Sequence, residues 1–163
     1  MAIPIYLWLY DNIGNQIKGS VNVLSRNHSI EVVALRHMIE LPTDLHTGNI
    51  TGTRIHQPVS FDKEIDSSSP YIYQALTQGR TLKSAEFKYY RINGAGYEEH
   101  YFSLILDGVK VESTTSLMYD IYDAYGEKRN HIECVDLDYE KITWLCVDGN
   151  IRHTDSINEC SAA

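Results

Sequence analysis

The chain has 163 residues, of which 43% are apolar and 22% charged, and its mean hydropathy is -0.30. This size and composition indicate a single globular domain spanning residues 1–163 and exclude a disordered or collagen-like chain. The formal charge of -8 argues against nucleic acid and anionic lipid as partners, because the 14 basic residues form no strong cluster.

The first predicted element is a strand from Ile3 to Tyr10. Both of its faces carry large apolar side chains, so neither is expected to be solvated. The run is much shorter than the roughly 20 apolar residues of a membrane span, and it lacks the pattern of a secretory signal. We therefore expect no membrane insertion and a chain that starts in the cytoplasm. The two faces are Ile5, Leu7 and Leu9, and Tyr6, Trp8 and Tyr10.

Turn residues at 11–15 precede a second long strand, predicted from Ser29 to Leu41. Residues Pro42 to Thr53 are rich in Gly, Thr, Asn and Asp, which predicts a long irregular loop. A loop of this length is a candidate contact surface, and a mobile connector is the alternative. Extended structure resumes from Arg54 to Phe61.

One short helix is predicted from about Pro70 to Gln78. Ser69 is its expected N-cap, Pro70 suits its first position, and Gly79 lies just past its end. Ile72, Ala75 and Leu76 share one face, which we expect to pack against a sheet.

Strands 85–92 and 97–106 flank the hairpin signal Asn93-Gly94-Ala95-Gly96, and Asp107-Gly108 predicts a further reversal before 109–111. The apolar residues between 114 and 125 have helical spacing. Residues 131–147 are predicted to be extended. Their apolar residues stand at odd-numbered positions up to 139 and at even-numbered positions from 142, so a bulge or corner is expected near Glu140 and Lys141. A turn at 148–150 then leads into a closing strand near 151–153.

The sequence offers no recognisable catalytic, metal or cofactor motif. It has no nucleophile elbow, no phosphate-binding glycine loop and no Cys-x-x-Cys pair. Cys134, Cys146 and Cys160 are expected to be reduced thiols. Tyr89 and Tyr90 could stack single-stranded bases, but the net charge opposes this. A small ligand-binding β-barrel remains an alternative function, and a hydrolase is a second one.

Several segments together resemble the Hcp family, the tube-forming secreted proteins of bacterial type VI secretion. The resemblance covers about nine-tenths of the chain, and the block from Ser67 to Phe87 is its most specific part. It is carried by residues 1–4, 6–9, 17–21, 29–34, 42–44, 47–48, 51–56, 63–71, 81–88, 90–93 and 139–144.

The resemblance implies a mainly β fold, a two-sheet β-barrel with one flanking helix. It also implies hexameric rings that stack into a tube inside a sheath, carry effector proteins, and leave the cell with a tip spike and without a signal peptide. The resemblance further implies that the protein has no catalytic activity and no cofactor. Where the helical spacing at 114–125 conflicts with the family, which has a strand and then a loop, we follow the family and expect a strand to about Met118.

The resemblance further implies that the loop from Pro42 to Arg54 is an arm that reaches a neighbouring subunit or ring. Arg36 and Met38 are expected to face the lumen, because their side of the second strand loses its apolar pattern. The residues expected to make subunit contacts are Tyr6, Trp8, Thr43, Asp44, Leu45, His46, Thr47, Gly48, Asn49, Ile50, Thr51, Gly52 and Arg54.

Overall fold

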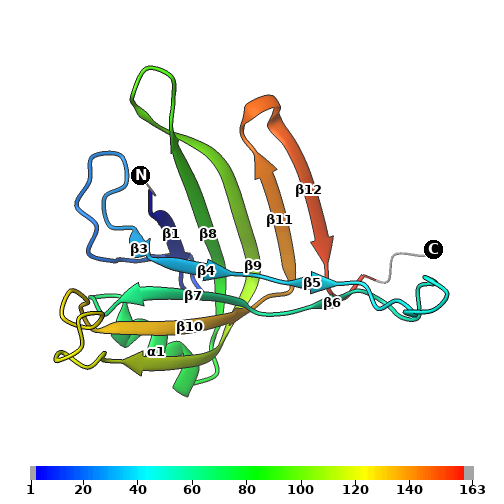
Figure 1. Ribbon diagram of the computed structural model, residues 1–163, viewed down its shortest axis with the longest axis horizontal. Coiled ribbons are helices and arrows are strands. Elements are labelled where there is room, and N and C mark those ends of the chain that lie inside the picture. Colours follow the sequence, from blue (N-terminus) through cyan, green and yellow to red (C-terminus); the bar gives the residue numbers. More distant parts are fainter. Residues whose placement is uncertain (1–2, 160–163) are drawn as a thin grey trace.

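The computed structural model describes residues 3–159 as a mainly β molecule with one α-helix (Figure 1). This confirms the predicted fold class. The elements are β1 (Ile5–Tyr10), β2 (Gln16–Ile17), β3 (Ile30–Val32), β4 (Ala34–Arg36), β5 (Ile39–Glu40), β6 (Ile55–His56), β7 (Val59–Glu64), α1 (Ser69–Thr77), β8 (Thr81–Ile92), β9 (Glu98–Leu117), β10 (Ile132–Asp138), β11 (Lys141–Cys146), the 3-10 turn Asp148–Asn150 and β12 (Ile151–Ser156).

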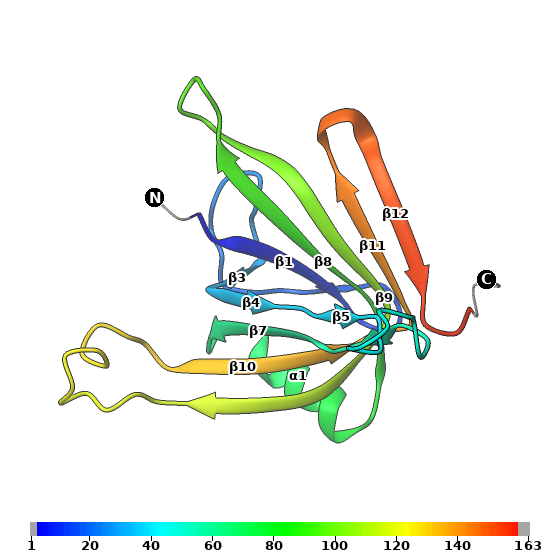
Figure 2. The same ribbon diagram turned by 45° about the vertical axis from the view of Figure 1, so that its right-hand side comes forward.

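Ten strands form one strongly curved antiparallel sheet, and β5 and β6 form a separate two-stranded sheet. The main path runs β2-β1-β8-β9-β10-β7-β4, while β11 and β12 extend it from β9. Because β3 pairs with β1 and β4 pairs with β7, the segment 30–36 contacts both ends of the path. Figure 2 shows the resulting two layers, with β8, β11 and β12 rising above β7 and β10.

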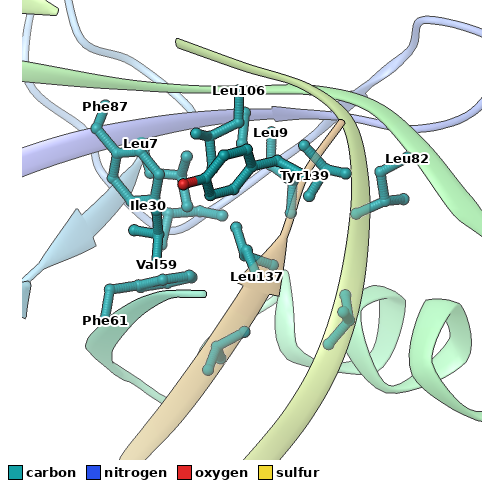
Figure 3. Packing of buried hydrophobic residues seen from close by; sticks show 14 of the residues in the cluster. Leu7, Leu9, Ile30, Val59, Phe61, Leu82, Phe87, Leu106, Leu137 and Tyr139 are labelled. Atoms are coloured by element: carbon teal, nitrogen blue, oxygen red, sulfur yellow. The ribbon is translucent and has the colours of Figure 1, made fainter. Parts of the chain in front are cut away.

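Apolar side chains fill the space between the layers (Figure 3). Leu7 and Leu9 come from β1, and Phe61 of β7 meets Phe87 of β8 edge to face with ring centroids 5.4 Å apart. Burying large aliphatic and aromatic side chains in this way is the main stabilising contribution to such a sheet. The interior is therefore a packed core.

The helix α1 begins one residue earlier than predicted. Ser68, not Ser69, occupies the N-cap position, and no side-chain hydrogen bond caps the helix. The Ser69 hydroxyl instead donates to the buried Glu133 carboxylate over 2.7 Å. Ile72 and Ala75 are buried against the sheet, as their spacing predicts. Within residues 3–159, no helix has both the length and the apolar character of a membrane span.

The predicted reversal at Asp107-Gly108 is wrong, because this dipeptide lies within β9, a single strand of 20 residues. Gly108 has φ +64° and marks a corner instead. Before it, residues 102–107 pair with β11, and after it, residues 110–117 pair with β10. The matching corner near Glu140, which was predicted, separates β10 from β11.

The second long strand was predicted as continuous and is in fact broken. A bend at Val33 separates β3 from β4, and residues 37–38 separate β4 from β5. The break arises because the chain changes its pairing partner from β1 to β7 at this point. At 114–130 the strand ends at Leu117 and a loop follows, in agreement with the family pattern and against the helical spacing.

Candidate functional site

The most prominent feature outside the sheet is a hairpin of residues 39–56, which we call the arm. It contains β5, the loop 41–54 and β6, and it projects beyond the main sheet near β12 (Figure 1). Ile39 pairs with His56 and Glu40 with Ile55, and a further bridge joins Thr43 to Ile50. The loop predicted as irregular is therefore a hairpin with cross-strand hydrogen bonds.

Asp44 organises the tip of the arm. Its Oδ1 accepts hydrogen bonds from the backbone amides of His46 and Thr47 over 2.7 and 2.9 Å. The backbone also turns here, with the amide of Gly48 donating to the carbonyl of Asp44 over 2.8 Å. The amide of Thr47, followed by that of His46, lowers the pKa of Asp44. The tip thus has a defined conformation that the Asp44 carboxylate stabilises.

The arm presents apolar side chains to solvent. Leu45 is 98% exposed at the tip, and Leu41, Ile50 and Ile55 are also exposed. Burial of such side chains against another surface is favourable, and several exposed apolar side chains on one element are typical of an interaction site. The predicted contact residues 43–52 therefore lie together on one projecting element, although their contact with another subunit stays a prediction.

A hydrogen-bonded cluster of side chains, which we call the root, holds the arm to the sheet. Tyr139, in the corner between β10 and β11, has its hydroxyl 2.7 Å from Nε2 of His37 and 2.8 Å from Nδ1 of His56. Nε2 of His56 lies 2.8 Å from Oδ2 of Asp155 on β12. His37 lies two residues before the arm and His56 is its last residue, so both ends of the arm are tied to one hydroxyl.

Arg54 completes the root. Its guanidinium donates Nη2 hydrogen bonds of 2.8 Å to Oδ1 of Asp155 and to the carbonyl of Ser156, and one of 3.0 Å to the carbonyl of Glu159. Its Nε also pairs with Asp155. Bidentate contact of this kind fixes the geometry of both partners. The predicted contact residue Arg54 is therefore engaged within its own chain.

Local charges shift the pKa values of the root. The Arg54 hydrogen bond lowers the pKa of Asp155, and His56 adds to this effect. Burial raises the pKa of Tyr139 far above its ordinary value, and the nearby Asp138 and Asp155 carboxylates contribute. Burial also lowers the pKa of His37, with a further lowering from His56. Beside the root a surface cleft of about 670 Å³ separates the arm from the sheet.

The outer face of β1 is covered by its own chain. Tyr6 is only 6% exposed, because Arg26 lies 4.7 Å from the centroid of its ring and 4.5 Å from that of Tyr90. Trp8 is half-buried, and Nζ of Lys88 lies 4.5 Å from its ring centroid. Intramolecular cation–π contacts thus cover the apolar outer face of β1. Tyr6 therefore offers little accessible surface for the predicted subunit contact.

Arg36 and Met38 are both exposed, as a lumen-facing role requires. Arg36 on β4 pairs with Ser60 on β7. The hydroxyls of Ser60 and Ser113 both donate to the carboxylate of Asp136, so polar side chains continue across β10 to β9. The position of Arg36 and Met38 relative to a lumen stays a prediction. No group of three or more His, Cys, Asp or Glu side chains in the described part of the chain is arranged to hold a metal ion. Cys134 and Cys146 are free thiols, and Cys160 lies outside the described residues.

The sequence did not identify His37, Tyr139 and Asp155 as members of one cluster. Tyr139 lies in a segment that the sequence marks only by a corner and by the family resemblance, and Asp155 lies beyond the last predicted strand. The predicted corner was the one sequence feature that pointed to Tyr139, because a side chain at a strand break need not alternate between the two faces of the sheet. The turn at 148–150 indicates that β11 pairs with β12, but no local pattern indicates that His37 and His56 meet Tyr139.

Comparisons with known proteins agree over most of the chain. Residues 6–145 match the family described as "Type VI secretion system effector, Hcp". The "Major exported protein" of Pseudomonas aeruginosa is 31% identical over 134 residues, which are 82% of this chain and 75% of that protein.

Solved structures extend this similarity to the fold. The Hcp1 protein of the E. coli EAEC 042 pathovar is 56% identical and superposes with a TM-score of 0.86 over 95% of this chain and 99% of that one. The secreted protein Hcp3 of Pseudomonas aeruginosa has the same fold, with 24% identity and a TM-score of 0.77 over 97% of this chain and 100% of that one.

Proposed function

This chain belongs to the Hcp family of type VI secretion proteins, and from that premise we propose that it is a structural subunit of the secretion tube. In this proposal six copies form a ring, the rings stack into a tube inside the sheath, and the lumen carries effector proteins. The tube is exported with its tip spike, having assembled in the cytoplasm. The subunit has no catalytic role.

The observation that carries the proposal is the 56% identity to an Hcp1 protein across 95% of this chain. Similarity at that level covers the arm, the corner and both sheet layers together. A ligand-binding barrel and a hydrolase, the alternatives left open by the sequence, gain no support from it. The filled interior also argues against a ligand held between the layers.

The accessible surface supports a role in assembly. It amounts to 10313 Å², whereas a compact monomer of this mass exposes only about 8,200 Å². The excess is comparable with the area that an obligate interface buries, about 2,000 Å² or more in total. A subunit in a ring has two different faces, and each contributes about 1,000 Å², half of the total of one interface.

The arm is the element best suited to reach another subunit. It projects from the sheet, its backbone is ordered by Asp44, and it exposes Leu45 and Ile50. Its other side chains are mostly small and polar, as suits an interface that must form and come apart. We therefore assign the ring-to-ring contact to the arm and the ring itself to the sheet edges.

Light scattering coupled to size-exclusion chromatography tests the ring. The expected mass is six times the 18.6 kDa of one chain, and negative-stain micrographs of the same fraction should show annular particles. A single-chain mass at high protein concentration, without annular particles, would refute the proposal and favour a monomeric ligand-binding protein.

A further inference from the structure

The root contains three hydrogen bonds in series that share three protons. In the neutral arrangement, Nε2 of His56 donates to Asp155, so its Nδ1 must accept from the hydroxyl of Tyr139. The Tyr139 oxygen then accepts from Nε2 of His37. Each of the three bonds holds one proton, and no donor faces another donor.

The series accommodates one additional proton. If His56 becomes an imidazolium, its Nδ1 donates to the Tyr139 oxygen and the hydroxyl turns to donate to Nε2 of His37. His37 stays neutral and changes tautomer, with its proton on Nδ1 in place of Nε2. The positive charge then lies against the Asp155 carboxylate, which is a favourable pair. All three bonds survive, with the direction of two of them reversed.

A second additional proton breaks the series. With both histidines charged, each donates to the Tyr139 oxygen and the hydroxyl proton has no acceptor among the three bonds. Two positive charges then face each other across one oxygen atom, where burial makes each of them costly. The arrangement that ties both ends of the arm therefore excludes the doubly protonated state.

We propose that His37, Tyr139 and His56 form a proton-sensitive latch that fixes the arm when at most one histidine is charged and releases it when both are. Release separates the ends of β5 and β6 from the corner at Tyr139, while the sheet below is unaffected. The latch is a property of the single chain, so it holds whether or not the arm contacts another ring.

The charged groups around the latch are of both signs. Arg54 and Asp155 face His56, Asp138 and Asp155 lie near Tyr139, and Lys110, Glu140 and Glu159 line the adjacent cleft. Because Arg54 and Asp155 neutralise each other, neither supplies a second counter-ion for His37. Burial, with a contribution from His56, lowers the pKa of His37, which is consistent with a closed latch that keeps this ring neutral.

The sign of the pH dependence follows from proton counting. The released arm can hold a proton on each of the two rings, because they no longer face each other across one oxygen atom. The closed latch takes up fewer, so acid shifts the equilibrium towards release. The latch is closed above about pH 6.5, the ordinary pKa of a histidine, because neither state binds the extra protons there. Below that pH, the ratio of released to closed arm rises by up to about tenfold per pH unit for each additional proton that the released arm binds.

Hydrogen exchange measured by mass spectrometry on the full chain tests the latch. After correction for the intrinsic rates, exchange in peptides from 39–56 should be several-fold faster at pH 5.5 than at pH 7.5. The hairpin at 93–97 should show no such change and serves as an internal reference. His37→Gln, which cannot take up the proton, should lose the pH step, whereas the control His131→Gln, at an exposed position outside the arm and the root, should keep it.

Repeating the comparison in Leu45→Asp, which removes the proposed stacking contact, separates the latch from the tube. The same pH step is expected there if the latch is correct, even if the tube proposal fails. A wild-type arm whose exchange changes no more than that of 93–97 would overturn the latch. An undiminished step in His37→Gln would overturn it as well, and if that variant does not fold the wild-type comparison decides.

Discussion

Lys63 and Glu133 form an ion pair that is completely buried beneath the start of α1. Nζ of Lys63 lies 2.6 Å from Oε1 of Glu133 and 3.0 Å from Oδ1 of Asp66, and it also donates to the hydroxyl of Ser69 over 3.1 Å. A buried pair of this kind adds little net stability, but loss of one partner leaves an uncompensated charge in the core. The pair therefore holds the first residue of the helix, Ser69, to β7 and β10.

Replacing Lys63 by Met should lower the free energy of unfolding by about 3–5 kcal/mol, because Glu133 is left buried without its cation. Urea denaturation followed by circular dichroism measures this. Lys18→Met removes an exposed lysine and should cost less than about 0.5 kcal/mol. Adding Glu133→Leu to Lys63→Met should recover part of the loss, and no recovery would contradict the role assigned to the unpaired charge.

Cys134 is a thiol that the fold protects from reaction. Burial, followed by the adjacent Asp62 carboxylate, raises its pKa to about 11. Since only the thiolate reacts, a variant that keeps Cys134 alone should be alkylated by iodoacetamide about a hundredfold more slowly when folded than in urea. Asp62→Asn should speed the folded reaction by removing one cause of the shift. A rate unchanged by Asp62→Asn would mean that steric access alone protects the thiol.

Residue patterns alone could not explain the outer face of β1. The alternation of Tyr6, Trp8 and Tyr10 correctly predicts a strand with no solvated face. It does not reveal that Arg26, from a loop 20 residues away in sequence, covers Tyr6 and pairs with Glu98. Such a contact depends on the path of an irregular loop, which has no periodicity to read.

At the scale of the element, β9 owes its length to one glycine. Gly108 has φ +64°, and a Cβ at this position would lie 2.7 Å from the side chain of Glu140 in the opposite corner. Gly108→Ala should therefore cost about 1–2 kcal/mol of stability, since an L residue is strained in the left-handed region. Thermal unfolding compares it with Gly94→Ala, where φ is ordinary and nothing lies within 4 Å. Equal melting temperatures of the two variants would contradict this account.

Local patterns located most strand boundaries but not the partners of each strand. The corner near Glu140 was predicted from a change of parity, and the helix from its flanking residues, because both signals are local. The reversal at Asp107-Gly108 was wrong because that dipeptide is equally typical of a corner within one strand. The helical spacing after residue 114 misled because Tyr119 and Tyr125 gather around Arg129 in a loop.

The candidate site was predictable only in part, for the same reason. The polar composition of residues 42–53 predicted a long irregular loop and a candidate contact surface, and the resemblance implied an arm that reaches another subunit. The root was not predictable, because its hydrogen bonds join His37 and His56 to Tyr139, and His56 to Asp155, across 83 to 102 residues of sequence. The pairing of β4 with β7 and of β7 with β10 brings the arm to the corner at Tyr139, and the pairing of β11 with β12 brings Asp155 there.

For the molecule as a whole, the part that stabilises the fold differs from the part to which we assign the proposed contact between rings. The core lies between the sheet layers and the Lys63 ion pair is buried beneath the start of α1, whereas the arm adds only its own hairpin bonds and its root. A substitution at the tip of the arm should therefore alter assembly without altering folding. Leu45, with 98% of its surface exposed, is the side chain on which this can be tested.

Leu45→Asp should leave rings intact and shorten or abolish their stacks, because a buried contact would acquire an unpaired carboxylate. Its melting temperature should match that of the wild type. Leu24→Asp is the matched control, since Leu24 is 95% exposed and lies in the loop on the opposite side of the molecule from the arm (Figure 1). Sedimentation and electron microscopy compare the three proteins. Stacks of wild-type length in Leu45→Asp would show that the tip of the arm does not join one ring to the next.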